Sequence, residues 1–259
     1  MLNSHPFLAG EGPILMAHRG GGAEVPENSL AALQHTSDLG LRYLETDAHA
    51  TTDGVVVLLH DQLLDRTTTS TGLLTDRSWE ELADVRDASG GALVRLDEAL
   101  ELFPHLRFNV DAKSDSVVGP LAELAARHPE RVLVASFSDS RLRHLRALTP
   151  ESATSLGQGE VARLVALSQL PLAAALPLAR NVPAYRHAVA VQVPPQHRRI
   201  PVVTRRFVRL AHALGLAVHV WDADDAPTWQ RVLAAGADGI ITDYPTAARD
   251  WLTARGAWH

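Results

Sequence analysis

Residues 204–242 read TRRFVRLAHALGLAVHVWDADDAPTWQRVLAAGADGIIT, and this stretch carries the pattern that predicts the fold. Thr204–Leu214 has a helical apolar repeat that stops at a glycine, and the β-rich run Ala217–Trp221 follows it. A second helical stretch, Ala226–Ala235, also stops at a glycine, and Gly239–Thr242 is typical of a short buried strand. Glycine directly after a helical repeat is a common helix end. Helix and strand therefore alternate here, which indicates neighbouring parallel strands.

The same alternation extends over the rest of the chain. The other expected strands are Ile14–Ala17, Tyr43–Asp47, Arg107–Asp111, Val132–Ser136, Ala153–Leu156 and Ala188–Gln192. The other expected helices are Ser29–Leu39, Leu96–Leu102, Val117–Arg127, Ser140–Leu148, Val161–Leu167 and Thr246–Arg255. A (β/α)8 barrel needs roughly 250 residues, so we predict an α/β chain folded as a TIM barrel, with a doubly wound open sheet as the alternative. The apolar run Leu172–Leu178 leaves the strand count open, because it could be a further strand or an irregular segment.

One segment interrupts the alternation. Thr51–Gly54 contains the hairpin signal Asp-Gly, and Val55–Leu59 is expected to return beside the second strand. Residues 62–93 then form an insertion rich in Thr, Ser, Asp and Gly, with a short helical stretch near Trp79–Val85. An insertion after a barrel strand usually lies at the catalytic face. We expect a single domain over residues 1–259.

Composition excludes several classes of function. The chain has 24 basic and 30 acidic residues, a formal charge of −6, which disfavours general binding to nucleic acid. It has no cysteine, which excludes disulfides, thiolate catalysis and cysteine–zinc sites. Residues 1–20 lack a signal-peptide pattern, and no apolar run reaches the roughly 18 residues of a membrane span. We therefore expect a cytoplasmic protein with no nucleic-acid partner and no stable membrane insertion.

Ionisable side chains follow the expected strands at the ends where barrels of this kind build active sites. His18 and Arg19 follow the first strand; a histidine exchanges protons near neutral pH, and a guanidinium matches phosphate oxygens. Glu45 and Asp47 lie two residues apart on the second strand and so share a face. Burying two carboxylates is costly without a cation, and oxygen ligands suit Mg²⁺ or Ca²⁺. His49 has the same parity, and a turn histidine is its alternative interpretation.

Two further groups complete the set. His60 ends the apolar run of the hairpin, with Asp61 beside it to orient the imidazole. Asp111 and Lys113 share a face, so a carboxylate ligand for a metal would lie beside a phosphate-binding ammonium. Each group also has a plainer interpretation: a structural His–Arg pair, a solvated strand face or a simple ion pair. Together they supply two histidines, three carboxylates and two cations, which fits hydrolysis of a phosphate diester.

Other polar and aromatic residues have secondary interpretations. Trp221 offers a flat apolar face for a glycerol or alcohol group, with core filling as its alternative, and Phe137 is a weaker candidate of the same kind. Glu27 and Asn28 could hold other site residues in place, although Asn28 is explained more simply as a helix cap. Asp243 is expected to orient the last loop rather than to bind metal.

Eight short motifs occur in a characteristic order. They are HRG at 18–20, PENS at 26–29, ETD at 45–47, TDG at 52–54, HD at 60–61, DRT at 65–67, VHVW at 218–221 and GADGIITDYP at 236–245. Together they closely resemble the motifs of the glycerophosphodiester phosphodiesterase family, over nearly the whole chain. The resemblance implies a (β/α)8 barrel with the 62–93 insertion over its mouth. It also implies hydrolysis of glycerophosphodiesters to glycerol 3-phosphate and an alcohol.

The resemblance also assigns roles to residues. It implies His18 and His60 as the acid–base pair, and one divalent cation, Mg²⁺ or Ca²⁺, held by Glu45 and Asp47. At the third acidic position the family commonly has Glu, whereas this chain has Asp111, one methylene shorter. Aspartate also occurs there in the related phospholipase D toxins, but those lack the HD and DRT motifs of the insertion. The departure keeps the charge and could change the metal preference.

Rival functions remain open at this level. The same two histidines could run a lyase reaction on lysophospholipid-like diesters that releases a cyclic phosphate. A barrel without activity, retained for binding, is the other rival, and the presence of both histidines and all three carboxylates argues against it. Between the histidines, we favour His60 as the acid, because Asp61 beside it could hold its proton.

Overall fold

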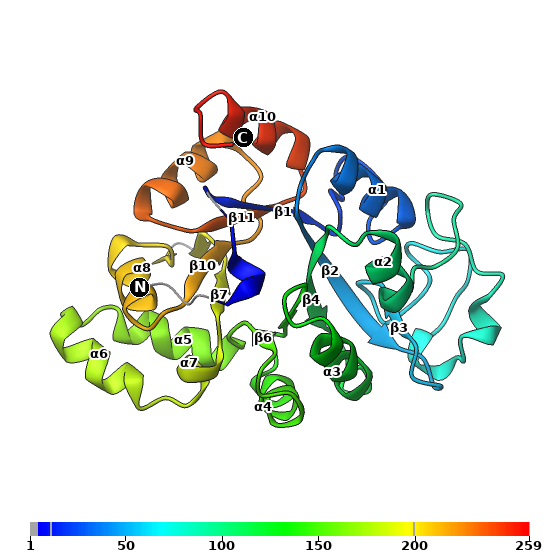
Figure 1. Cartoon of the computed structure of the whole chain (residues 1–259), viewed down its shortest axis with the longest axis horizontal. Coiled ribbons are helices and arrows are strands. Elements are labelled where there is room, and N and C mark those ends of the chain that lie inside the picture. The colour runs from blue at the N-terminus through cyan, green and yellow to red at the C-terminus, as the bar shows by residue number, and fades with distance from the viewer. Residues whose placement is uncertain (1–4, 11, 199, 259) are drawn as a thin grey trace.

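The structure is a computed structural model that describes residues 5–10, 12–198 and 200–258. Its main sheet curls into a ring of parallel strands with the helices around the outside (Figure 1). In sheet order the strands of the ring are β6 (Ala153–Thr154), β5 (Val132–Ala135), β4 (Arg107–Ala112), β2 (Tyr43–Ala50), β1 (Ile14–His18), β11 (Gly239–Thr242), β10 (Ala217–Val220) and β7 (Ala190–Val193). Across the gap between β6 and β7, the Val189 amide donates a hydrogen bond to the Thr154 carbonyl at 2.9 Å. The ring is thus nearly closed, so the predicted barrel is confirmed and the open-sheet alternative is wrong.

Helices follow most of these strands. They are α1 (Leu30–Asp38), α2 (Leu96–Leu102), α3 (Val118–Arg127), α4 (Asp139–Leu148), α5 (Gln158–Leu167), α6 (Leu172–Arg180), α7 (Ala184–His187), α8 (Arg205–Ala213), α9 (Ala226–Ala235) and α10 (Pro245–Thr253). Several of these helices begin after a residue whose side chain caps the first turn. Ser29, for example, accepts a hydrogen bond from the Ala32 amide. The run Leu172–Leu178 lies in α6, so its interpretation as a strand or irregular segment is wrong. Pro171 precedes its first turn, where proline costs no helical hydrogen bond.

The interior of the barrel is apolar at the end where β1 and β2 begin. There the 3-10 turn η1 (Pro6–Leu8) places Phe7 against Tyr43, with ring centroids 5.4 Å apart. The Tyr43 hydroxyl donates a hydrogen bond to the Phe7 carbonyl at 2.8 Å. Apolar side chains from the other strands fill the same cluster: Met16, Leu133, Ala153, Ala190, Ala217 and Ile241. This closed floor leaves the opposite ends of the strands to carry polar groups.

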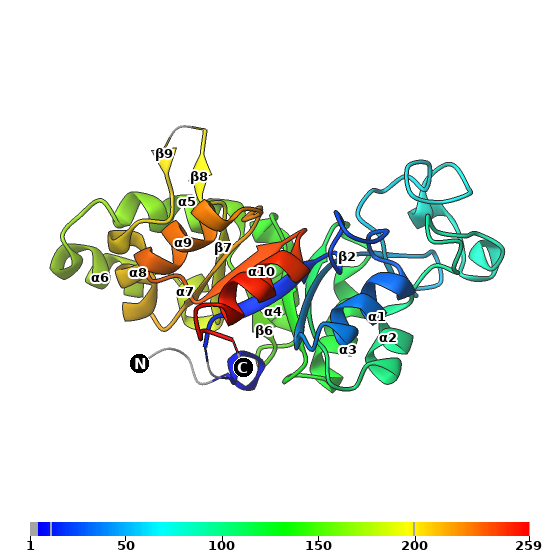
Figure 2. The ribbon, with the colours of Figure 1, turned by 90° about the horizontal axis from the view of Figure 1, so that it is seen from above.

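Two hairpins extend from those opposite ends. β3 (Val56–Leu58) pairs antiparallel with β2, as predicted, and leads into the insertion. The insertion contains η2 (Leu74–Asp76) and η3 (Glu80–Leu82), and η3 confirms part of the helical stretch expected at Trp79–Val85. A second hairpin, β8 (Gln196–His197) with β9 (Ile200–Pro201), was not predicted. Figure 2 shows it projecting on the same side of the barrel as the insertion.

Two sequence-based expectations concern the chain as a whole. Within the described residues, no helix is both long and apolar enough to cross a membrane. The expectation that residues 1–20 are not a signal peptide rests partly on residues 1–4, which lie outside the described residues.

Candidate active site

Three carboxylates meet where β2 and β4 run side by side. Asp47 and Asp111 are direct partners in the pairing of the two strands, and Glu45 lies one pleat earlier on β2. All three face the barrel interior and are buried, with exposed fractions of 8% for Glu45, 1% for Asp47 and 6% for Asp111. The alternation of side chains along a strand therefore brings the predicted trio together.

Two cations from neighbouring strands contact these carboxylates. Nζ of Lys113 lies 2.9 Å from Oδ1 of Asp47 and 2.7 Å from Oδ2 of Asp111. Nε of Arg19 lies 3.2 Å from Oδ2 of Asp47, as an ion pair without hydrogen-bond geometry. Burial alone would raise the pKa of Asp47, but Lys113 and Arg19 outweigh it and hold that pKa below its usual value. Asp47 is therefore an anion between two cations.

Glu45 lies beside a histidine rather than beside the side-chain charge of a lysine or an arginine. Its Oε2 accepts a hydrogen bond from the Arg19 amide at 3.3 Å and lies 3.7 Å from Nε2 of His18. Burial, followed by the repulsion of Asp47, raises the pKa of Glu45 above its usual value. The charged side chains of Lys113 and Arg19 contact Asp47 and Asp111 but not the carboxylate of Glu45. These two cations therefore do not neutralise all three carboxylates.

The first histidine is held by a residue at the far end of the chain. Nδ1 of His18 lies 2.9 Å from Oδ1 of Asp243, just after β11. Burial opposes protonation, but Glu45 and Asp243 outweigh it and raise the pKa of His18 to about 9. Asp243 thus orients a site residue rather than only its loop.

Arg19 adopts the left-handed backbone conformation (φ 52°), which is unusual for a residue other than glycine. Such conformations often occur at functional sites.

The second histidine stands at the start of the insertion. Nδ1 of His60 lies 2.6 Å from Oδ1 of Asp61, as the sequence predicts, and the other Asp61 oxygen accepts from Nε of Arg66 at 2.5 Å. Arg66 also donates to Glu27, at 2.7 Å and 3.1 Å. Glu27 in turn accepts from Arg19 at 3.3 Å. This chain of ion pairs ties the insertion to the mouth of the barrel.

Two other residues from the sequence analysis support the site. The His49 side chain is fully buried, and its Nε2 lies 3.2 Å from the His60 carbonyl, so it braces the backbone of His60. Asn28 donates to Oδ2 of Asp47 at 3.2 Å and accepts from Thr46 at 2.7 Å. The cap of α1 is Ser29, so the helix-cap interpretation of Asn28 is wrong.

Two aromatic side chains lie after β5 and β10, at the same ends of the strands as the charged groups. Phe137 follows β5 and is 57% exposed, and Trp221 follows β10 and is partly buried. Their rings meet edge to face with centroids 5.9 Å apart. Nζ of Lys113 lies 5.9 Å from the centroid of Phe137. An apolar pair of aromatic rings therefore lies next to Lys113 of the charged cluster.

The carboxylate trio suits a hard divalent cation. Oδ1 of Asp111 is buried without a hydrogen-bond partner, so it is available as a ligand. Glu45, Asp47 and Asp111 together offer only oxygen donors, which Mg²⁺ and Ca²⁺ prefer. In the ranges that the structure describes, however, no three histidine or acidic side chains are already arranged as a metal site. The ammonium of Lys113, between Asp47 and Asp111, would have to yield to a cation there.

Comparisons with known proteins identify relatives of this chain. Residues 18–247 match the model of the glycerophosphoryl diester phosphodiesterase family. The "Probable glycerophosphodiester phosphodiesterase 2" of Mycobacterium tuberculosis is 38% identical over 97% of this chain and 95% of its own. Human "Lysophospholipase D GDPD1" is 25% identical over 92% of this chain and 85% of its own.

The fold has close solved counterparts. An Oleispira antarctica phosphodiesterase, solved in complex with the product sn-glycerol-3-phosphate, superposes with a TM-score of 0.75 at 22% identity. The match covers 93% of this chain and 97% of that one. The family match spans almost the whole barrel, including the strands that carry the carboxylates and both histidines. The chain therefore belongs to the glycerophosphoryl diester phosphodiesterase family.

Proposed function

We propose that this protein hydrolyses glycerophosphodiesters to glycerol 3-phosphate and an alcohol, in a single barrel domain and with a divalent cation. The observation that carries the proposal is the pairing of each histidine with its own aspartate, close to three buried carboxylates. The 38% identical relative from Mycobacterium tuberculosis supports the substrate class. The product named for the Oleispira antarctica structure supports the position of bond cleavage.

The histidines would move the two protons of the reaction. Hydrolysis forms a bond from a water oxygen to phosphorus and breaks the bond from phosphorus to the alcohol oxygen. His18 would take the proton of the water, and His60 would give a proton to the departing alkoxide. In each case a carboxylate on Nδ1 leaves Nε2 to face the substrate. The raised pKa of His18 depends largely on Glu45, a proposed cation ligand, so it does not decide this division.

The remaining residues would bind the phosphodiester. Glu45, Asp47 and Asp111 would hold one Mg²⁺ or Ca²⁺, which supplies polarisation of the phosphoryl oxygens when bound. Arg19 and Lys113 would neutralise charge on those oxygens in the transition state. Trp221, with Phe137 beside it, would pack against the carbon skeleton of the glycerol or alcohol. We propose a small phosphodiester as the substrate. We also propose that the protein is cytoplasmic.

A product assay tests the proposal. Glycerophosphocholine, glycerophosphoethanolamine, glycerophosphoglycerol and lysophospholipids would be compared side by side, with phosphorus NMR of the products. We expect glycerol 3-phosphate from the water-soluble diesters. No turnover of any diester would overturn the proposal and favour a binding protein.

A second candidate function is release of the alcohol from lysophospholipids. The 25% identity to human "Lysophospholipase D GDPD1" favours it. In the same panel, preference for lysophospholipids would select this function. A cyclic phosphate signal would identify the lyase reaction in place of hydrolysis.

A further inference from the structure

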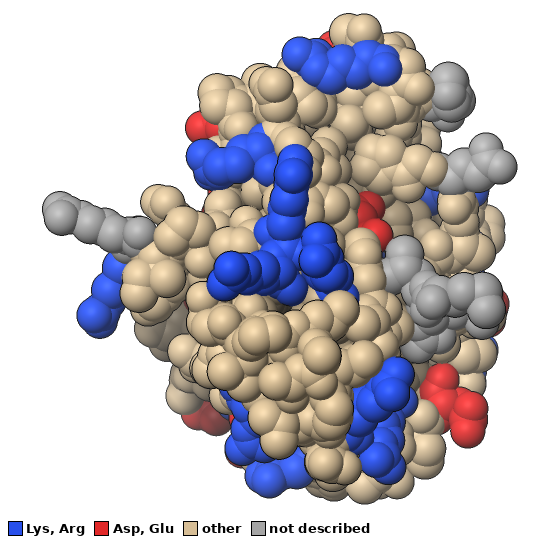
Figure 3. All heavy atoms as spheres, turned by 90° about the vertical axis from the view of Figure 1, so that its left-hand side faces the viewer, with Lys and Arg blue, Asp and Glu red and all other residues tan. Residues whose placement is uncertain are grey.

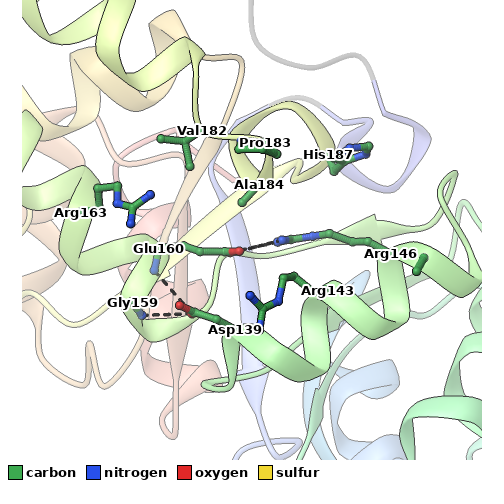
Figure 4. Close-up of a pocket in the computed structure, with 11 residues that line it drawn as sticks. Asp139, Arg143, Arg146, Gly159, Glu160, Arg163, Val182, Pro183, Ala184 and His187 are labelled. Atoms are coloured by element: carbon green, nitrogen blue, oxygen red, sulfur yellow. Dashed lines mark hydrogen bonds and ion pairs between the residues drawn. The ribbon is translucent and has the colours of Figure 1, made fainter.

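A cavity outside the barrel lies between α4 and α5. Its volume is about 520 Å³, within the range of roughly 300–1,000 Å³ that is usual for small-molecule sites. The two helices form its walls, and the segment that leads into α7 closes one side (Figure 4). None of the residues that line it belongs to the proposed active site.

A buried ion pair forms the floor of this cavity. Arg146 of α4 is 8% exposed, and its two terminal nitrogens donate to the Glu160 carboxylate at 2.9 Å and 3.2 Å. It also donates to the Thr154 hydroxyl at 3.1 Å and the Ser155 carbonyl at 2.7 Å. Glu160 is therefore fully engaged by Arg146 and by the Gly157 amide, which donates to it at 3.0 Å.

The second carboxylate in the cavity is also engaged. Oδ1 of Asp139 accepts the Gly159 amide at 3.1 Å and the Glu160 amide at 3.5 Å, at the start of α5. This close approach depends on glycine, because a Cβ at position 159 would collide with the Asp139 carboxylate. Asp139 thus acts as an internal anion for the α5 N-terminus rather than as a partner for a cation in the cavity.

Two guanidinium groups remain without a protein partner. Arg143 lies one turn from Arg146 on α4, and Arg163 lies one turn from Glu160 on α5, so both face the cavity. Among the described residues, neither has an ion pair or side-chain hydrogen bond in the structure, in contrast to Arg146. Figure 4 shows them coming from the two walls of the cavity. Two such planar forks around one space match the oxygens of a phosphate group.

The other residues of the lining and the neighbouring surface indicate the chemical class of the ligand more closely. Val182, Pro183 and Ala184 form an apolar side, with Ala147 on α4. The neighbouring face over α8, whose helix carries three arginines, shows a cluster of basic side chains with few acidic ones (Figure 3). We propose that the cavity between α4 and α5 binds a small organic phosphate monoester. Arg143 and Arg163 hold its phosphate, and its carbon skeleton lies against Val182–Ala184.

Calorimetric titration with phenyl phosphate tests the proposal in the full chain. Lys113 is the only lysine of the sequence, so labelling with lysine that carries ¹³C at Cε alone yields one side-chain NMR signal that reports on the active site. We expect a binding phase that leaves this signal unmoved and that weakens at least tenfold in the double variant Arg143→Gln/Arg163→Gln. Inorganic phosphate should bind the same site at least threefold more weakly, because it lacks the apolar part.

The matched control is Arg42→Gln/Arg127→Gln, which removes the same charge from two other exposed positions that lie outside the cavity and outside α8. The control should retain the calorimetric binding phase. Unchanged affinity in the Arg143/Arg163 variant, or an equal loss of affinity in the control, would contradict the assignment of the site to this cavity. Equal affinity for inorganic phosphate would contradict the proposal that the ligand is an organic phosphate. Failure of the diesterase assay would leave these outcomes unaffected, because the NMR signal separates the two sites.

Discussion

His18 and Asp243 are 225 residues apart in the sequence, yet Nδ1 of the one lies 2.9 Å from Oδ1 of the other. The contact exists because β1 and β11 pair in parallel, so the segments that follow them emerge side by side. Gly22 lies against the Asp243 carboxylate, where a Cβ would stand 3.1 Å from Oδ1. The imidazole is therefore fixed with Nε2 toward Glu45, 3.7 Å away.

We expect Asp243→Asn to lower kcat while leaving KM nearly unchanged, because Asp243 positions His18 and does not bind substrate. The loss should be about tenfold or more, and smaller than the roughly 10²–10⁴-fold expected for removing a general acid or base. Steady-state kinetics on a glycerophosphodiester measure it. Asp250→Asn, an exposed aspartate on α10, is the control and should change neither constant. A raised KM at unchanged kcat would mean that Asp243 binds substrate instead.

Chelation should abolish diesterase activity, and Mg²⁺ or Ca²⁺ should restore it. A cation at the carboxylates must displace the ammonium of Lys113 from Asp47 and Asp111, so the single ¹³C-lysine signal should shift on titration with the metal. Glu45→Gln or Asp47→Asn should weaken that titration while the barrel stays folded. Full activity in excess chelator, with metal removal verified by elemental analysis, would contradict the proposed cation.

His219 should make the fold sensitive to acid. Its side chain is fully buried on β10, and burial lowers its pKa from 6.5 to about 4. Between those values the unfolded chain binds the proton and the folded chain does not, so acidification favours unfolding. pH 5 lies about 1.5 units below the pKa of His219 in the unfolded chain. Protonation of the unfolded chain at that pH therefore lowers the free energy of unfolding by about 2 kcal/mol.

Urea unfolding at pH 7.5 and pH 5 measures this effect. We expect His219→Gln to lose about 2 kcal/mol less than the wild type on acidification, because glutamine does not titrate. His144→Gln, at an exposed position on α4, should behave like the wild type. Equal acid sensitivity in the wild type and His219→Gln would mean that water reaches His219 and that burial does not control its charge.

The sequence could predict those parts of the molecule that depend on local periodicity. The strand–helix alternation predicts the barrel, and the two-residue spacing of Glu45 and Asp47 places both on one face. α6 was missed, because the apolar run Leu172–Leu178, with Pro171 before it and Pro177 inside it, carries no clear period. The hairpin of β8 and β9 is too short to leave a pattern.

The connections between distant residues could not be predicted in the same way. The contact of His18 with Asp243 depends on which strands become neighbours when the sheet closes. The link from Arg66 to Glu27 depends on how the insertion folds back over the mouth. The DRT motif marked Arg66, but no spacing rule pairs it with a residue 39 positions earlier.

The division of labour between the histidines can be tested with the leaving group of the substrate. Hydrolysis of an alkyl diester needs both a proton acceptor for water and a proton donor for the alkoxide. We therefore expect His18→Ala and His60→Ala each to lower kcat by about 10²–10⁴-fold. The double variant should lose much less than the product of the single losses, because the two groups act in one step.

A nitrophenyl diester releases a stable anion and needs little protonation, so it should restore turnover to the variant that lacks the acid. We expect that variant to be His60→Ala, because Asp61, whose Oδ1 lies 2.6 Å from Nδ1 of His60, is placed to stabilise the imidazolium that a general acid requires. His18→Ala should stay defective on the same substrate, since water must still be deprotonated. Rescue of His18→Ala alone would exchange the two roles, and rescue of both or neither would contradict an acid–base division. Wild-type turnover of an alkyl diester by either variant would make that histidine structural.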